Sequence, residues 1–324
     1  MPRRVVVAGA SGLIGAALVE SLRADGVSVT RLVRRPVRAS DEVEWLTGYT
    51  PLDPGVLEGA DAVVGLNGAS IGRFPWTSAY KHTLVRSRIA PTQALARAVR
   101  ELGADPPAFV SSSAVGFYGS APRGVISEKS PKGTSFLADL CGEWESVAQG
   151  AGAHARVALV RTAPVVHADG VLKALLLLSK LGVSGPIGRG TQIWPWISLD
   201  DEVAGIRHAI DHDIDGPVNL SGPTPASAND LGFAIAVRLN RPYLVRAPEW
   251  GLRLALGSDA TEALLMTDAD VRPAVLEATG FRFAHTTVED AVASAVPAAE
   301  PATIVIGGRP TGLSRERTAA IGSR

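Results

Sequence analysis

A glycine-rich turn near the start of the chain constrains the fold more than any other feature. Gly9, Gly12 and Gly15 are spaced three residues apart in the segment Val7-Ala-Gly-Ala-Ser-Gly-Leu-Ile-Gly15. An apolar run over 4–9 precedes the turn, and apolar residues recur at helical spacing over 13–23. Tight turns, close backbone approach to a ligand and helix-to-strand packing all favour a residue without Cβ. The pattern predicts a strand, a turn and a helix whose first N–H groups bind phosphate.

The rest of the first half alternates between apolar strand patterns and helical patterns. Further strands are predicted at 27–33, 61–66, 108–113 and 156–161. Helices are predicted at 76–102, where Pro91 should cause a kink or a break, and at 136–149. Alternating strands and helices form parallel sheets. The sequence therefore predicts an α/β protein, a Rossmann doubly wound parallel sheet with a smaller C-terminal substrate lobe.

The pattern loosens after about residue 161, which suggests a division of the chain. Residues 1–165 should form a nucleotide-binding domain whose sheet is completed by later segments. Residues 166–296, with helices expected at 200–210 and 228–239, should form the substrate-binding lobe and C-terminal segment. Residues 297–324 lack sustained periodicity and read as a flexible tail, although Thr303–Ile306 has the composition of a short strand.

Composition excludes several kinds of partner. Basic and acidic residues both number 32, so no net field favours nucleic acid or an anionic membrane. The single cysteine, Cys141, forms no internal disulfide, and the six histidines lack the paired spacing of a metal site. The apolar run 175–178 is far shorter than the about 20 residues that span a bilayer. We expect a cytoplasmic protein with a small-molecule substrate and no metal, as a monomer or a homodimer.

The end of the second strand indicates which dinucleotide the chain binds. NAD-binding proteins usually place an acidic residue there to hold the ribose 2′-hydroxyl. This strand instead ends in Arg31-Leu-Val-Arg-Arg35. A guanidinium from Arg34, with Arg35 nearby, suits a 2′-phosphate. The sequence favours NADP over NAD, and the alternative is an ordinary solvated basic strand end.

Several segments of the chain together resemble a known family. They are Gly9-Ala-Ser-Gly-Leu-Ile-Gly15, Ala69-Ser-Ile-Gly-Arg-Phe-Pro-Trp-Thr77, Ser87-Arg-Ile89, Ser113-Ala-Val-Gly-Phe-Tyr-Gly119, Phe136-Leu-Ala-Asp-Leu-Cys-Gly-Glu-Trp-Glu145 and Gln192-Ile-Trp-Pro-Trp-Ile197. The chain resembles the atypical NAD(P)-dependent epimerase-like family of extended short-chain dehydrogenases, which carries a C-terminal domain of unknown function. Gly280-Phe-Arg-Phe283 resembles that domain's signature, so the resemblance extends to about Ala295.

The glycine turn and the resemblance together define a candidate cofactor site. Two loops depart from the family: its Asn-Leu-Ala-Gly appears as Gly65-Leu-Asn-Gly68, and its Arg-Thr-Gly appears as Arg161-Thr-Ala163. The predicted cofactor-binding residues are Gly9, Ser11, Gly12, Leu13, Ile14, Gly15, Arg34, Arg35, Gly68 and Ser111.

The resemblance also defines what is missing. The wider class uses a serine and a Tyr-x-x-x-Lys pair, in which the tyrosine exchanges a proton with the substrate while the lysine holds the nicotinamide ribose. With Glu145 as reference, Leu137 stands at the tyrosine position and Cys141 at the lysine position. Leucine carries no proton, and a thiol is never cationic. We expect Cys141 to be buried as a small hydrophobic residue.

Two residues are candidates for the catalytic groups. Ser113 falls at the strand end where the class places its substrate-polarising hydroxyl. Tyr118 follows in the next loop and is the candidate substitute acid. The alternative for the run Ser111-Ser-Ser113 is local hydrogen bonding at the end of the strand.

Aromatic and polar residues suggest a substrate pocket. Indole faces bind sugar-like or planar ligands, and polar side chains fix their orientation. The candidate residues are Arg73, Trp76, Gln192, Trp194 and Trp196. The alternative is aromatic packing between the lobes. The acidic segment Ser198-Leu-Asp-Asp-Glu202 is predicted to be a capped helix start and not a metal cluster.

Two functions fit these observations. The first is an NADP(H)-dependent oxidoreductase or epimerase that acts on a small sugar-like or carbonyl substrate. The second is a non-catalytic module that binds NADP(H) as a sensor or to stabilise an interaction surface. The predicted cofactor cleft favours the first, and the missing tyrosine and lysine favour the second.

Overall fold

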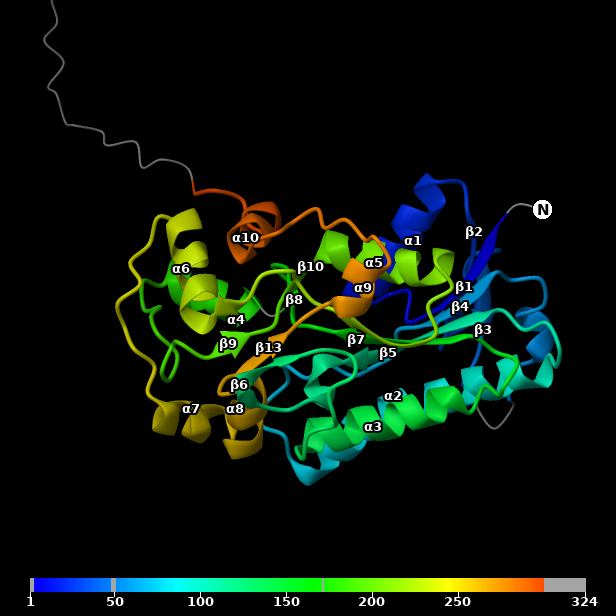
Figure 1. Ribbon diagram of the computed structural model, residues 1–324, viewed down its shortest axis with the longest axis horizontal. Coiled ribbons are helices and arrows are strands. Elements are labelled where there is room, and N and C mark those ends of the chain that lie inside the picture. The colour runs from blue at the N-terminus through cyan, green and yellow to red at the C-terminus, as the bar shows by residue number, and fades with distance from the viewer. Residues whose placement is uncertain (1–2, 48–50, 171, 300–324) are drawn as a thin grey trace, which may run out of the picture.

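The structure is a computed structural model that describes residues 3–47, 51–170 and 172–299. It contains a seven-stranded parallel sheet with the strand order β11-β7-β5-β4-β1-β2-β3 (Figure 1). The strands are β1 Arg4–Ala8, β2 Ser28–Val33, β3 Glu42–Glu44, β4 Ala62–Gly65, β5 Ala108–Ala114, β7 Val157–Thr162 and β11 Gly216–Leu220. The predicted Rossmann sheet is confirmed. The segment Thr303–Ile306 lies outside the described residues.

Two of the seven strands were not predicted from the sequence. The strand β3 has only three residues, and two of them are glutamates. The strand β11 contains Pro217 and Asn219, which are both depleted in strands. Its position at the edge of the sheet tolerates the proline, because an edge strand need not donate every backbone N–H to a neighbour.

Helices cover both faces of the sheet. The helices α1 (Leu13–Ala24) and α5 (Leu199–Asp211) lie on one face, and α2 (Ser78–Glu101) and α3 (Phe136–Gln149) lie on the other (Figure 1). The side chains of Thr77, Ser135 and Ser198 accept backbone N–H bonds at the starts of α2, α3 and α5. The predicted capped start of α5 is confirmed. The helix α2 continues through Pro91, so the expected break does not occur.

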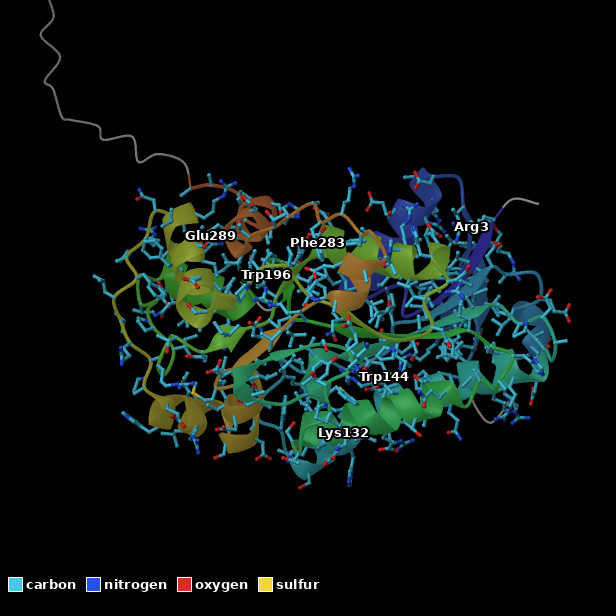
Figure 2. The ribbon with its side chains drawn as sticks, viewed as in Figure 1. Arg3, Lys132, Trp144, Trp196, Phe283 and Glu289 are labelled. Carbon is cyan, nitrogen blue, oxygen red and sulfur yellow. The ribbon has the colours of Figure 1, made fainter. Side chains whose placement is uncertain are left out.

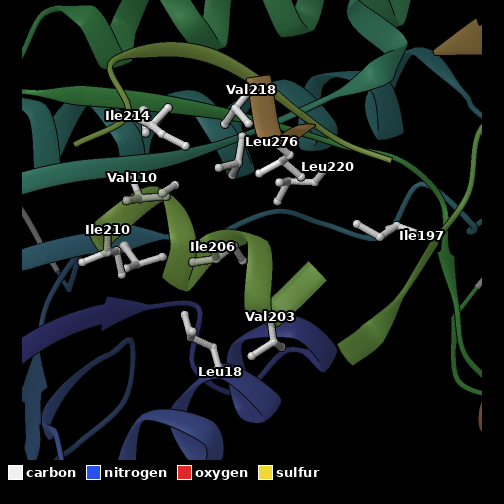
Figure 3. Close-up of a cluster of buried hydrophobic side chains, with 14 of the residues drawn as sticks. Leu18, Val110, Ile197, Val203, Ile206, Ile210, Ile214, Val218, Leu220 and Leu276 are labelled. Carbon is white, nitrogen blue, oxygen red and sulfur yellow. The ribbon is translucent and has the colours of Figure 1, made fainter. Parts of the chain in front are cut away.

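The core consists of two layers because alternate strand residues point to opposite faces of the sheet. Val5 and Val7 of β1 belong to a buried cluster with Leu18 of α1 and Ile206 of α5 (Figure 3). Val6 and Ala8 belong to a second cluster, which packs against α2 and α3. The continuous apolar run of β1 is therefore explained by burial on both faces.

A smaller lobe forms from the later part of the chain, on the left in Figure 1. Its helices pack around a third buried cluster that contains Trp194 and Trp196. The strand β13 pairs in parallel with β6, which ties the C-terminal segment back to the first half of the chain. The remaining elements are η1 Pro54–Val56, η2 Val115–Phe117, β6 Ala121–Ile126, β8 Val165–Val166, α4 Leu172–Lys180, β9 Ile193–Trp194, β10 Ile197–Ser198, β12 Ala226–Ser227, α6 Ala228–Arg238, α7 Glu249–Leu256, α8 Ser258–Leu264, β13 Ala269–Val271, α9 Ala274–Ala278 and α10 Val288–Ala295.

No helix within the described ranges combines the length and the apolar character needed to cross a membrane.

The layered core generates a stability prediction. Leu18 is fully buried between α1 and the sheet, whereas Leu254 of α7 is 83% exposed. The substitution Leu18→Ala should lower the free energy of unfolding by about 2–5 kcal/mol, because it removes buried methyl groups and leaves a cavity. The matched control Leu254→Ala should change it by about 0.5 kcal/mol or less. Urea denaturation measures both, and equal effects would contradict the packing described here.

Candidate functional site at the carboxyl edge of the sheet

The glycine turn brings two backbone segments into close approach. Gly9 has a φ of 83°, and a Cβ at this position would lie 2.6 Å from the carbonyl oxygen of Leu66, just after β4. A Cβ at Gly15 would lie 2.2 Å from the carbonyl oxygen of Gly9. Neither position accommodates a side chain. The turn is therefore held at the edge of the sheet between β1 and β4, where the strand order reverses.

The start of α1 is suited to bind an anion. Gly12 is its N-cap, and no side chain in the described part of the chain caps this end of the helix. The N–H groups of the first turn, including those of Leu13 and Ile14, lack partners within the helix. The side chain of Ser11 is exposed beside them. This geometry fits the pyrophosphate of a dinucleotide.

The loop after β4 carries a polar atom without a partner. Asn67 Oδ1 is buried and has no hydrogen-bond partner among the described residues. Buried acceptors without partners are rare in proteins and point to a missing ligand or water. Asn67 lies beside Gly68, which the sequence analysis placed in the cofactor site, but Asn67 itself was missed there. The departure from the family's Asn-Leu-Ala-Gly pattern was the only signal for it.

The two arginines at the end of β2 have different surroundings. Arg35 donates two hydrogen bonds to the Glu42 carboxylate, at 2.8 and 2.7 Å. These bonds lower the pKa of Glu42 to about 2. Arg34 is exposed, and no carboxylate in the described ranges lies within 4.0 Å of it. Among the described residues Arg34 is therefore an unpaired cation, and Arg35 is anchored beside it to Glu42.

The end of β5 leads into a buried polar network. Ser111 and Ser113 are both buried. The Ser113 hydroxyl donates to Glu145 Oε1 at 2.6 Å. Glu145 also accepts two hydrogen bonds from Arg161, at 2.8 and 2.7 Å. The Ser113 hydroxyl is thus oriented by an ion pair between α3 and β7.

Tyr118 belongs to the same network. Its hydroxyl accepts from Arg161 Nη1 at 2.8 Å and donates to Asn219 Oδ1 at 2.7 Å. Burial raises the pKa of Tyr118. Ser113 and Tyr118 are therefore connected through Arg161, as sequence proximity suggested. A direct proton transfer from Tyr118 to a substrate requires its hydroxyl to leave both partners, so the catalytic role of this residue stays a prediction.

The positions of the missing pair lie on α3. Leu137 is buried with Trp76 and Leu84. Cys141 is 3% exposed, and burial raises the pKa of its thiol to about 11. The expectation that Cys141 is a buried neutral residue is confirmed. Neither side chain exchanges protons near neutral pH.

The predicted pocket residues do not form one group. Trp76 packs edge-to-face with Phe136 at 6.0 Å, in a different buried cluster from Trp194 and Trp196. The indole N–H groups of all three tryptophans donate to backbone carbonyls. Trp196 lies within the smaller lobe (Figure 2). Arg73 is exposed and lies over the Tyr80 ring at 5.2 Å.

Gln192 differs from the tryptophans. It is buried, its Nε2 donates to two backbone carbonyls, and its Oε1 has no partner within the described chain. The tryptophan geometry is that of aromatic packing, and the substrate role of the five residues stays a prediction. The described residues contain no group of three or more His, Cys, Asp or Glu side chains arranged to hold a metal ion.

A class of protein follows from this arrangement. A parallel sheet that reverses order beside a glycine turn, with a serine at the end of β5, defines an extended short-chain dehydrogenase fold. Residues 5–221 match the NAD dependent epimerase/dehydratase family, and residues 247–295 match the domain of unknown function DUF1731. The chain belongs to the NAD dependent epimerase/dehydratase family, and it carries the DUF1731 segment that the sequence analysis expected.

Individual relatives agree with this assignment. An epimerase family protein of Mycobacterium leprae is 40% identical over 296 residues, which cover 90% of this chain and 95% of that protein. The Bos taurus epimerase family protein SDR39U1 is 31% identical over 286 residues, covering 86% and 95%. A crystal structure of human epimerase family protein SDR39U1 (isoform 2) with NADPH is similar to this chain with a TM-score of 0.79. That human protein is 27% identical, over 90% of this chain and 98% of its own.

One buried carboxyl group near the site lies outside this machinery. Glu202 on α5 is fully buried, and its Oε1 accepts from Thr162 Oγ1 at 2.7 Å. Its Oε2 has no partner among the described residues. Burial raises the pKa of Glu202 to about 8. Glu202 is therefore predominantly protonated in the folded protein at pH 7.

This carboxyl should make stability depend on pH. Below pH about 4.5 it is protonated in both states, and the folded state is not penalised. As pH rises from about 4.5 to 8, only the unfolded state ionises, so stability falls by up to about 1.4 kcal/mol per unit. Glu202→Gln should make the thermal midpoint of unfolding depend less on pH between pH 5 and 8. The exposed control Glu44→Gln should leave the change of the thermal midpoint with pH as in the wild type. If Glu202→Gln also leaves it unchanged, the raised pKa assigned to Glu202 is contradicted.

Proposed function

We propose that this chain binds NADP(H) at the carboxyl edge of the sheet, between β1 and β4. The supporting observation is the uncapped start of α1 beside the buried, unpartnered Asn67 Oδ1. These groups offer a phosphate site and a hydrogen-bond acceptor at the same edge of the sheet. The human relative was crystallised with NADPH, which agrees with the proposal.

Each end of the site would hold a different part of the cofactor. The N–H groups after Gly12 would bind the pyrophosphate, which the uncapped start of α1 supports. Arg34 would pair with the 2′-phosphate, with Arg35 beside it. Gly68, in the loop after β4, and Ser111, within β5, would line the same site. We assign residues 1–165 to this domain, whose sheet is completed by the later strand β11, and the rest of 166–296 to the substrate-binding lobe. Of the expected tail 297–324, residues 300–324 lie outside the described residues.

We propose that the chain is an epimerase or oxidoreductase for a small sugar-like or carbonyl substrate. Bound NADP(H) would supply or accept a hydride. Ser113 would orient the reacting oxygen once its hydroxyl proton turns from Glu145 to the substrate. Tyr118 would be the proton source once its hydroxyl leaves Asn219. Arg73, Trp76, Gln192, Trp194 and Trp196 are the candidate substrate contacts.

One observation favours a second function. Leu137 and Cys141 are both buried and cannot relay a proton. A protein that holds NADP(H) without turnover would need neither a tyrosine nor a lysine there. The second candidate is therefore a non-catalytic NADP(H) sensor or interaction module.

The cofactor proposal predicts a difference between NADPH and NADH. NADPH should bind more tightly and raise the thermal midpoint more, because a ligand of the native state stabilises it. Arg34→Ala should weaken NADPH binding about tenfold, which corresponds to the loss of one charge-assisted bond, and leave NADH binding unchanged. Arg246→Ala, an exposed arginine of the smaller lobe, is the control. Binding of neither nucleotide would overturn the proposal.

A second measurement separates the enzyme from the sensor. In a screen of sugar-like and carbonyl substrates, a reductase should oxidise NADPH, and an epimerase should convert its substrate without net consumption of the cofactor. In either case Ser113→Ala should lower kcat about 100-fold, because it removes the hydroxyl that orients the reacting oxygen. Its affinity for NADPH should stay within about twofold of the wild type. Tight NADPH binding without turnover of any substrate would instead favour the sensor.

A further inference from the structure

Arg88 on α2 is a cation that has no role so far in the candidate cofactor and substrate sites. Its Nη1 donates to the carbonyl oxygen of Leu84 and its Nη2 to that of Ala69, both at 3.1 Å. Within the described ranges no carboxylate lies within 4.0 Å of its guanidinium, although the structure forms other arginine–carboxylate pairs. Arginines that lose water contact are normally paired. This guanidinium is partly buried without an anionic partner.

The position of Arg88 places it at the candidate cofactor site. A Cβ added at Gly68 would lie 3.1 Å from Arg88 Cζ, so the guanidinium packs directly against the loop after β4. On its other side it lies over the ring of Trp144 at 5.3 Å, on the helix α3 shown in Figure 2. Cys141 is one turn earlier on that helix, and its thiol is neutral. Arg88 thus lies between the cofactor loop and the helix face with Cys141.

We propose that Arg88 binds the ribose hydroxyl groups at the nicotinamide end of NADP(H). It would replace the lysine of the wider class, whose position Cys141 occupies in this chain. This inference rests on the proposed binding of NADP(H). A guanidinium has five N–H donors, and the carbonyls of Leu84 and Ala69 with the Ser87 hydroxyl at 3.5 Å leave two of them for a vicinal diol. The Arg88 side chain is already hydrogen-bonded to Ala69 in the loop after β4, so little conformational entropy is lost when the cofactor binds.

This assignment also limits what the site can do chemically. Burial without an anionic partner lowers the pKa of Arg88, yet an arginine stays protonated in proteins. Arg88 therefore donates hydrogen bonds but does not exchange protons. With Leu137 at the tyrosine position, this part of the site holds the cofactor and leaves the proton to be supplied from the Ser113 side.

Calorimetric titration of the full chain with two ligands tests the role of Arg88. NADPH contains the nicotinamide ribose, whereas 2′,5′-ADP contains the adenosine and the 2′-phosphate but lacks it. Arg88→Met should weaken NADPH binding about tenfold and leave 2′,5′-ADP binding within about twofold of the wild type. Arg88→Gln should behave alike, because its amide keeps a donor for Ala69 while it removes the charge. If the Met variant fails to fold, the Gln variant provides the same comparison.

The outcomes distinguish this inference from the cofactor proposal. If the wild type binds neither ligand, the proposed function itself fails. If the wild type binds both and the Gln variant binds NADPH equally well, the role of Arg88 is overturned. Equal weakening of both ligands, together with a lower thermal midpoint, would show that Arg88 only ties α2 to the loop, which also overturns it.

Discussion

The structure depends on the close approach of the β1–α1 turn to the loop after β4. A Cβ at Gly9 would lie 2.6 Å from the carbonyl oxygen of Leu66, so the approach requires glycine there. A Cβ at Gly15 would lie 2.2 Å from the carbonyl oxygen of Gly9, so α1 packs against the turn only with glycine at that position. The close approach fixes the start of α1 at the point where the strand order reverses. Along this junction lie the first N–H groups of α1, the buried Asn67 Oδ1 and the guanidinium of Arg88; neither the N–H groups nor Oδ1 has a side-chain partner among the described residues. A shift of this turn would separate these groups.

A buried ion pair organises the neighbouring part of the site. The side chains of Arg161 and Glu145 are only 5% and 8% exposed, and such pairs are costly to bury unless their remaining polar atoms are satisfied. Here Ser113 and Tyr118 provide those bonds. The network connects β5, β7, α3 and, through Asn219, β11. The same bonds that satisfy the pair also occupy the two hydroxyl groups with candidate catalytic roles, which links the stability of the fold to its chemistry.

Local sequence patterns predicted the helices and strands that bury apolar side chains in the core. The helix at 136–149 and the five apolar strands of the sheet follow from periodicity, because their cores are continuous apolar stripes or runs. The strands β3 and β11 lack that signal, since pairing with an existing sheet creates them. Pro91 was expected to kink or break α2; the helix does not break there, and its packing against α3 and the sheet offsets the missing hydrogen bond. Trp76 and Trp196 lie in different buried clusters. Which cluster each joins depends on the elements that surround it, and the spacing of the tryptophans in the sequence does not predict this.

The sequence by itself determined the Rossmann fold, the family and the location of the phosphate-binding turn, because each depends on a few residues that are close in the chain. It also determined that the usual tyrosine and lysine are absent. Only the tertiary structure decided that Arg35 is held by Glu42 while Arg34 is free. The same holds for the burial of Asn67 Oδ1 without a partner and for the placement of Arg88 beside Gly68. Hydrogen-bond partners and burial depend on segments that are distant in sequence and meet only in the folded chain.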